Sequence, residues 1–242
     1  MQQQSTWERL APLTGLIFVA IVVAVFAIGG STPDQHDTAQ QVQAFYGQHH
    51  YKHEALSFVL ALSIPFLLFF VSILRHELRR QGGTGQLANA AFAGGVLAAA
   101  GFGILAAVHL TLAIAAGSAN TIGTTQVLNV LDSNDFLPMA AGLAVLVLAA
   151  GMSAVRHGGM PKWLAWVGIV IGVAIFTPAG FVGFLASGLW IAIVSVLLTL
   201  ARRSAEPAPA PSARCVDPVE ETAGESRLVT GRRLLGSTGR FL

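Results

Sequence analysis

Charged side chains are scarce in this sequence, and that scarcity decides its class. Only 11% of the 242 residues are charged, while 54% are hydrophobic. A soluble domain carries about 25% charged residues. Between Leu87 and Val155 the only ionisable side chains are His109, Asp132 and Asp135. The composition predicts an integral membrane protein whose main partner is the lipid bilayer, with no nucleic-acid partner.

Cysteine and the sequence motifs of common enzymes are also nearly absent. Cys215 is the single cysteine, which excludes an internal disulfide and a zinc site built from several thiolates. The sequence contains no phosphate-binding glycine loop with its lysine, no HExxH and no GxSxG. Nothing in the sequence therefore favours an enzyme.

Long apolar runs dominate the sequence instead. A helix needs about 20 apolar residues to cross a hydrocarbon core of about 30 Å. Six runs predict an all-α bundle of six transmembrane helices, at residues 11–30, 55–74, 88–116, 136–155, 163–179 and 182–200. Pro178 favours a tight turn between the last two runs, because proline does not continue a hydrogen-bonded helix.

The transmembrane domain is then expected to cover residues 11–203. Residues 1–10 form a short N-terminal segment. Residues 204–242 begin with a Pro/Ala-rich stretch and continue as a polar tail. We expect this tail to be disordered, since it cannot bury enough apolar surface to offset its chain entropy.

Positive charge predicts the orientation in the membrane. Thirteen of the fourteen Lys and Arg residues fall before the first run, in alternate loops or in the tail, and Lys52 is the exception. The positive-inside rule makes their side cytoplasmic. Both termini are therefore predicted to be cytoplasmic, in the plasma (inner) membrane of a bacterium.

Two outer loops carry patterns of short helices. The segment "DTAQQVQAFYG" predicts a helix from the N-cap Asp37 to the terminating Gly47, lying on the membrane rim. The segment "TTQVLNVLDSND" predicts a second one, with Asn134 or Asp135 capping the transmembrane helix that follows. We therefore expect short outer-face helices in loops 1 and 3.

Small residues at helical spacing predict close contacts between helices. Membrane helices pack through such residues, because lipid supplies little hydrophobic drive between them. Gly94 with Ala98, and Gly168 with Gly172, are the pairs expected to do so. Contact inside one bundle is the favoured interpretation, and a homo-oligomer through the same faces is the alternative.

The segment "QHHYKHEAL" at residues 48–56 raises the possibility of a site. His109 lies about seven residues before the outer end of its helix, roughly 10 Å in, where ionisable groups often have a function. Three helices have their outer ends on the same side, and imidazole with carboxylate suits transition metals. The predicted metal ligands are His49, His53 and His109, with His50, Glu54, Asp132 and Asp135 as possible additions.

Other interpretations of these residues remain open at this point. The cluster could be a proton-linked site or a solvated rim without a ligand. A b-type haem would require two axial imidazoles, for which His53 and His109 are the only candidates. A metal site requires a ring nitrogen of His109 within roughly 5 Å of one on His49, His50 or His53. No cofactor is singled out by the sequence.

Three stretches carry a resemblance to a known group of proteins: "LSIPFLLFFVSILRHELRR", "GGMPKWLAWVGIVIGV" and "GLWIAIVSVLLTLARR". They resemble uncharacterised multi-pass membrane proteins of actinobacteria, which are grouped as domains of unknown function. The resemblance covers approximately residues 10–203. It implies a six-helix membrane bundle and transfers no substrate or catalytic residue.

Three functions are compatible with these patterns. A structural or sensory membrane protein needs no buried chemistry. A metal- or haem-binding protein needs the outer histidines to meet His109. A small-solute transporter needs a polar path, and the first, fifth and sixth runs offer almost no ionisable lining for one.

Overall fold

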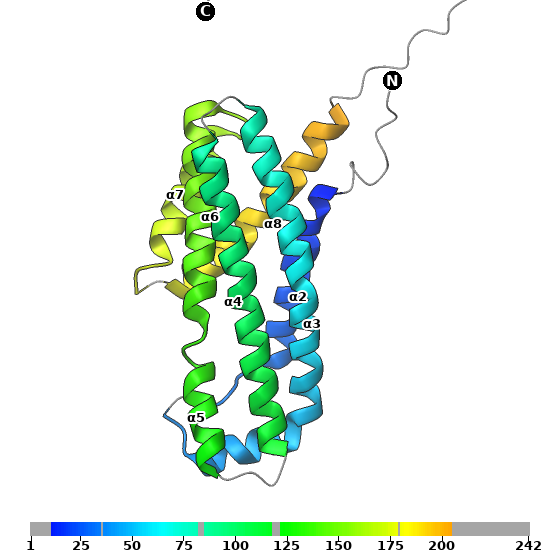
Figure 1. Ribbon diagram of the computed structural model, residues 1–242, viewed down its shortest axis with the longest axis vertical. Helices are drawn as coiled ribbons and strands as arrows, with labels where there is room; N and C mark the ends of the chain where they lie inside the picture. The colour runs from blue at the N-terminus through cyan, green and yellow to red at the C-terminus, as the bar shows by residue number, and fades with distance from the viewer. Residues whose placement is uncertain (1–10, 35, 82–84, 118–121, 179, 205–242) are drawn as a thin grey trace, which may run out of the picture. The chain divides into compact units, whose positions relative to one another are not determined.

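The computed structural model describes residues 11–34, 36–81, 85–117, 122–178 and 180–204 (Figure 1). The predictions for residues 1–10 and for the tail beyond 204 lie outside these residues. The elements are η1 (Ala11–Leu13), α2 (Thr14–Gly29), α3 (Ala39–Arg80), α4 (Gln86–Gly117), α5 (Ile122–Asp132), α6 (Phe136–His157), α7 (Lys162–Ala174) and α8 (Gly180–Ser204). The described residues contain no strand, which confirms the all-α class.

Helices α3, α4 and α6 run side by side and form the centre of the bundle (Figure 1). Gly94 and Gly101 of α4 face α6 so closely that a Cβ atom on either would collide with the α6 backbone. Gly142 of α6 likewise meets the backbone of Ala98. The predicted close approach of small residues is therefore found inside the chain.

The second predicted small-residue pair is also used within the bundle. Gly168 of α7 lies against the indole of Trp190, and Gly172 lies against Leu148 and the carbonyl of Ala144. These faces are occupied by the chain's own helices. A homo-oligomer would have to form through other surfaces.

Five helices, rather than the predicted six, are long and apolar enough to span a membrane among the described residues. The exception is α7, which has 13 residues and a length of about 20 Å, short of the bilayer core of about 30 Å. It ends at Ala174, before residue 179, where the predicted run ends. The backbone N–H and the hydroxyl of Thr177 both donate to the carbonyl of Ala174 and close a turn. Pro178 follows and adds no donor.

The first predicted short helix is wrong as a separate element, because α3 runs without a break from Ala39 to Arg80. Thr38 caps its start through a reciprocal capping box with Gln41. Gly47 lies inside the helix and does not end it. Val42 and Tyr46 are fully buried in a small cluster with Leu112 and Ala116, so this face packs on protein and not on the membrane rim.

The second predicted short helix is present as α5 (Ile122–Asp132). The prediction that Asp135 or Asn134 caps the next helix is wrong in detail. Asp135 occupies the N-cap position of α6, but its side chain makes no capping hydrogen bond. Asn134 instead donates from its side chain to the carbonyl of Val130 in α5.

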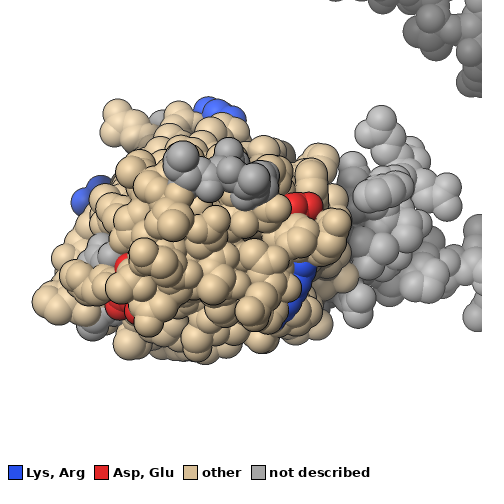
Figure 2. All heavy atoms as spheres, turned by 90° about the horizontal axis from the view of Figure 1, so that it is seen from below, with Lys and Arg blue, Asp and Glu red and all other residues tan. Residues whose placement is uncertain are grey.

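Residues 39–54 of α3, the C-terminal part of α4, and α5 together form one end of the bundle, which we call the α5 end (Figure 1). It lies beyond the apolar segments 55–74 of α3 and 136–155 of α6. The α3–α4 and α6–α7 connections lie at the opposite end, together with the start of α2 (Figure 1). Figure 2 views the molecule from the α5 end and shows a largely uncharged surface with isolated acidic and basic side chains.

Candidate functional site

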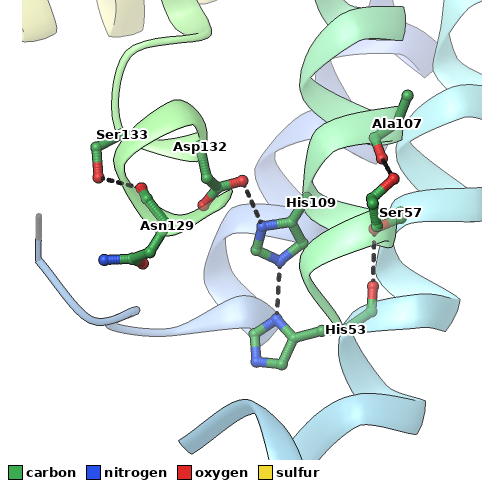
Figure 3. Close-up of polar contacts among 8 residues, drawn as sticks. His53, Ser57, Ala107, His109, Asn129, Asp132 and Ser133 are labelled. Atoms are coloured by element: carbon green, nitrogen blue, oxygen red, sulfur yellow. Dashed lines mark hydrogen bonds and ion pairs between the residues drawn. The ribbon is translucent and has the colours of Figure 1, made fainter. Parts of the chain in front are cut away.

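A chain of two histidines and one aspartate crosses the α5 end (Figure 3). The Nδ1 atom of His53 lies 2.9 Å from Nε2 of His109. The Nδ1 atom of His109 lies 3.0 Å from Oδ1 of Asp132. The three side chains come from α3, α4 and α5, so the hydrogen bonds join three elements that are distant in sequence. The condition set for a metal site, a ring nitrogen of His109 within roughly 5 Å of one on an outer histidine, is met by His53.

Local packing holds His53 in this position. Its side chain is 1% exposed, and its ring contacts those of Phe45, Tyr46 and His109 at 5.6, 5.1 and 5.1 Å between centroids. The continuous α3 helix creates this arrangement, because Tyr46 and His53 are seven residues apart and share one helix face. If the helix had ended at Gly47, as predicted, Tyr46 and His53 would not share one helix face.

Asp132 is positioned by the connection between α2 and α3. The side-chain amide of Asn129 donates to the carbonyl of Asp34 at 3.0 Å. The side-chain amide of Gln126 donates to the carbonyl of Asp37 at 3.3 Å. These bonds dock α5 on the α2–α3 connection, and the carboxylate one turn further along faces His109.

The hydrogen-bond order defines the chemistry of the free end of the chain. An ionised Asp132 accepts the Nδ1–H of His109, which leaves Nε2 of a neutral His109 as an acceptor. His53 then donates from Nδ1, and its Nε2 is an acceptor. When the pair gains one proton, either ring that carries it leaves an N–H on Nε2 of His53. The same atom therefore changes from acceptor to donor.

That free end, Nε2 of His53, is buried and has no hydrogen-bond partner among the described residues. An unsatisfied buried polar atom costs about 1–3 kcal/mol. Its residue lines a cavity of about 200 Å³. The polar side chains in the cavity wall are those of Thr32, His53, Ser57, His109 and Asp132. The cavity is large enough to hold several water molecules or a small polar group.

The other predicted ligands do not join the hydrogen bonds between Asp132, His109 and His53. His49 is exposed, and its Nδ1 lies 2.9 Å from the carbonyl of Phe45 on its own helix. His50 similarly bonds the carbonyl of Gly47 at 3.0 Å and stacks on Tyr51. Glu54 does not line the cavity. Within the described ranges, no group of three or more His, Cys, Asp and Glu side chains is arranged to hold a metal ion.

The distance between the two imidazoles also argues against an axial haem. Iron bound between two histidines at about 2.0 Å per bond separates the ligating nitrogens by about 4 Å. The facing nitrogens of His53 and His109 are 2.9 Å apart, which is the length of a direct hydrogen bond. The two rings are therefore hydrogen-bonded directly, with no room for a metal ion between the facing nitrogens.

Burial shifts the pKa values of two groups at this site. Burial, followed by the neighbouring His109, lowers the pKa of His53 to about 4. Burial, followed by the charge of Asp132, raises the pKa of Asp135 to about 7. Both residues lie outside the apolar segments 55–74 and 136–155.

The sequence identified His53, His109 and Asp132 as candidates but missed the cavity beside them. Thr32 and Ser57 complete its polar wall. Ser57 donates to the carbonyl of His53 at 2.9 Å (Figure 3). Its spacing of four residues after His53 was a usable signal, whereas the position of Thr32 depends on how the α2–α3 connection folds back.

Comparison with protein-family profiles, with curated proteins and with solved structures finds no match to this chain. The fold and the site therefore define its class by themselves. The long apolar helices make it a multi-pass membrane protein.

Proposed function

We propose that this protein has a sensory role in the membrane, and that its α5 end is a proton-responsive recognition site. The observation that carries the proposal is the continuous chain Asp132–His109–His53, which ends in a buried, unpartnered nitrogen beside a cavity. Histidine is the side chain whose charge changes most readily around neutral pH. A gained proton changes what this nitrogen can bind.

We place the α5 end on the non-cytoplasmic side of a bacterial plasma membrane. Five described cationic side chains support this orientation, because they belong to the opposite end: Arg75, Arg79, Arg80, Arg156 and Lys162. Positive charge gathers on the cytoplasmic side of membrane proteins. In this orientation the site samples the pH outside the cell. We propose that the protein belongs with the uncharacterised actinobacterial membrane proteins that its sequence resembles.

Protonation would also change how the helices are held. A cationic His109 bonds the carboxylate of Asp132 more strongly than a neutral one, because charge-assisted hydrogen bonds are roughly twice as strong. The bond joins α4 to α5, and the bond to His53 extends it to α3. A fall in external pH is therefore expected to tighten the α5 end.

Other titratable groups face the same site and belong to the response. Tyr46 of α3 contacts both imidazole rings. Asp135 lies close enough to Asp132 and His109 for their charges to change its pKa. Lys52 points its ammonium to the carbonyl of Gly29 at 3.4 Å, next to the cavity wall.

The test is ¹⁵N NMR of the purified protein, labelled at the histidine ring nitrogens and titrated between about pH 5 and 8. We expect a nitrogen–nitrogen coupling between His53 and His109, and a shift of both rings on acidification. Asp132→Asn removes the carboxylate with little change in shape and should lower the pH at which the pair responds.

His49→Ala is the matched control, because His49 lies on the same helix but is exposed and bonded to its own backbone. It should leave the coupling and the response of the pair unchanged. Absence of the coupling, or a pair that does not respond to pH in that range, would contradict the proposal.

A further inference from the structure

Three cavities lie against the side chain of Phe26. The first is the polar cavity at His53 and His109, of about 200 Å³. The second, of about 400 Å³, lies by the turn between α7 and α8. The third, of about 440 Å³, lies between α2 and α8. Phe26 belongs to the lining of all three.

The two larger cavities have apolar walls. Phe184 lines both of them, and its ring packs edge-on against Phe26 with 5.9 Å between centroids. Phe181 also lines both and is 72% exposed. Leu189 at the wall of the third cavity is 63% exposed. In a membrane-embedded bundle, exposed apolar side chains of this kind face lipid, so these cavities are accessible from the bilayer.

We propose that the three cavities open into one another around Phe26 and that the joined space binds an uncharged amphipathic lipid, with its polar head at His53 and its hydrocarbon chain along Phe26 into the groove between α2 and α8. The head carries a carbonyl or hydroxyl oxygen, as in a prenylated quinone or quinol. The inference rests on the proposed recognition site and names the class of ligand that this site takes.

The walls argue for an uncharged head. No Lys or Arg side chain lines any of the three cavities as described. A phosphate or sulfate head needs cationic donors, which this space does not supply. The carboxylate of Asp132 at the polar cavity repels an anion. A carbonyl or hydroxyl oxygen instead matches the single unpartnered nitrogen of His53, which accepts or donates according to the charge of the pair.

The walls also argue for a lipid and against a water-soluble molecule of the same head chemistry. The polar cavity is the smallest of the three, and the two larger cavities are lined mainly by aromatic and aliphatic side chains. A hydrocarbon chain that leaves water gains about 0.8 kcal/mol per methylene group, and a lipid makes this gain on entering the bilayer, from which the two larger cavities are accessible. Most of the available space therefore matches a chain rather than a head.

The test uses the full-length protein in nanodiscs with decylubiquinone as the probe, followed by the ¹⁵N ring signals of His53 and His109. We expect the probe to shift both sets of signals, and in His53→Ala binding is read from the His109 ring, which also lines the polar cavity. His53→Ala should weaken binding about tenfold by removing the head contact. Phe26→Trp should weaken it by a similar factor, because the larger ring fills the junction. Binding of the probe to Phe26→Trp is read from the same signals.

Leu62→Trp is the matched control for Phe26→Trp. Leu62 is 58% exposed on α3 and lines none of the three cavities. The same ring placed there should leave binding unchanged. An equal loss in Leu62→Trp would overturn the inference, as would displacement of the probe by phosphatidylglycerol at equal concentration.

A probe without the chain, 2,3-dimethoxy-5-methylbenzoquinone, separates this inference from the function on which it rests. Equal affinity of the two probes would overturn the lipid inference and leave the recognition site standing. A pair of histidines that neither couples nor responds to pH would overturn the proposed function. An affinity for decylubiquinone that is unchanged in His53→Ala, read from the ring nitrogens of His109, would overturn the placement of the head.

Discussion

The seam between α4 and α6 and the α5 end of the same helices are built in opposite ways. In the seam, Gly94, Gly101 and Gly142 let the backbones touch, so that no Cβ atom fits between them. At the α5 end, buried polar atoms of His53, Thr125 and Asn129 have no hydrogen-bond partner among the described residues. The seam contains the close packing that membrane helices use for stability. The α5 end retains unsatisfied groups that stability alone would remove.

This difference separates the part that holds the fold from the part that carries the site. A buried polar atom without a partner lowers the free energy of unfolding, and selection tolerates it where function needs it. Substitutions in the seam should therefore change stability strongly and the site little. Substitutions in the Asp132–His109–His53 chain should do the reverse.

The largest expected effect is that of Gly142→Leu in the seam. A side chain at this position collides with the backbone of Ala98, and overpacking of this kind costs about 3 kcal/mol or more when the backbone must move. The measurement is the free energy of unfolding in mixed detergent micelles. Gly103→Ala is the control, because its Cβ meets only Ile64 at 3.5 Å; it should be neutral or stabilise by up to about 1 kcal/mol.

Breaking the polar chain at one end should cost less. Asp132→Leu leaves the Nδ1–H of His109 without its acceptor, which destabilises the protein by about 1–2 kcal/mol. The same unfolding measurement checks this value. Asp132→Asn keeps an acceptor oxygen and should recover most of the loss. A larger effect than that of Gly142→Leu would reverse the comparison.

The capping box of α3 should contribute a local effect of about 1 kcal/mol. In Thr38→Ala the backbone N–H of Gln41 loses its acceptor, so hydrogen exchange should quicken in residues 39–54 and remain unchanged in residues 55–74. Uniform exchange along the whole helix would show that the two parts of α3 do not differ in local stability.

The smallest effect on stability is expected when all three hydrogen-bonded residues, His53, His109 and Asp132, are replaced together. The triple variant His53→Leu/His109→Leu/Asp132→Leu removes every partner together, so no member is left unsatisfied. Its free energy of unfolding should lie within about 1 kcal/mol of the parent, or above it. A loss of unfolding free energy as large as that of Gly142→Leu would mean that the three hydrogen-bonded residues serve to stabilise the fold.

Much of the fold could be predicted from apolar run length, because the bilayer fixes that length physically. The starts of α4, α6 and α7 fall within two residues of the predicted runs, which began at 88, 136 and 163. The end of α7 could not be predicted, since the turn at Thr177 depends on hydrogen bonds that composition does not show. The predicted six spans therefore reduce to five candidates among the described residues.

The continuity of α3 was missed for a related reason. Residues 39–54 are polar, and Gly47 is typical of a helix end. The helix continues because Tyr46 and Val42 pack on Leu112 of α4, a contact between residues more than sixty positions apart. The meeting of His53 with His109 could be anticipated from the shared outer side. The sequence could not show that Asp132 is the partner of His109 or that His49 is excluded, because both depend on how each helix is rotated about its axis.

The uninterrupted α3 helix has a mechanical consequence. Its 42 residues span about 63 Å, which is twice the thickness of the hydrocarbon core, so His53 and Arg79 belong to one rod. A change of tilt at the histidine end reaches the arginine end without the passage of any solute. Pro65 lies between them and is the point at which the rod bends most easily. Motion at one end of α3 is therefore coupled to the other end, with the helix turning or bending at Pro65.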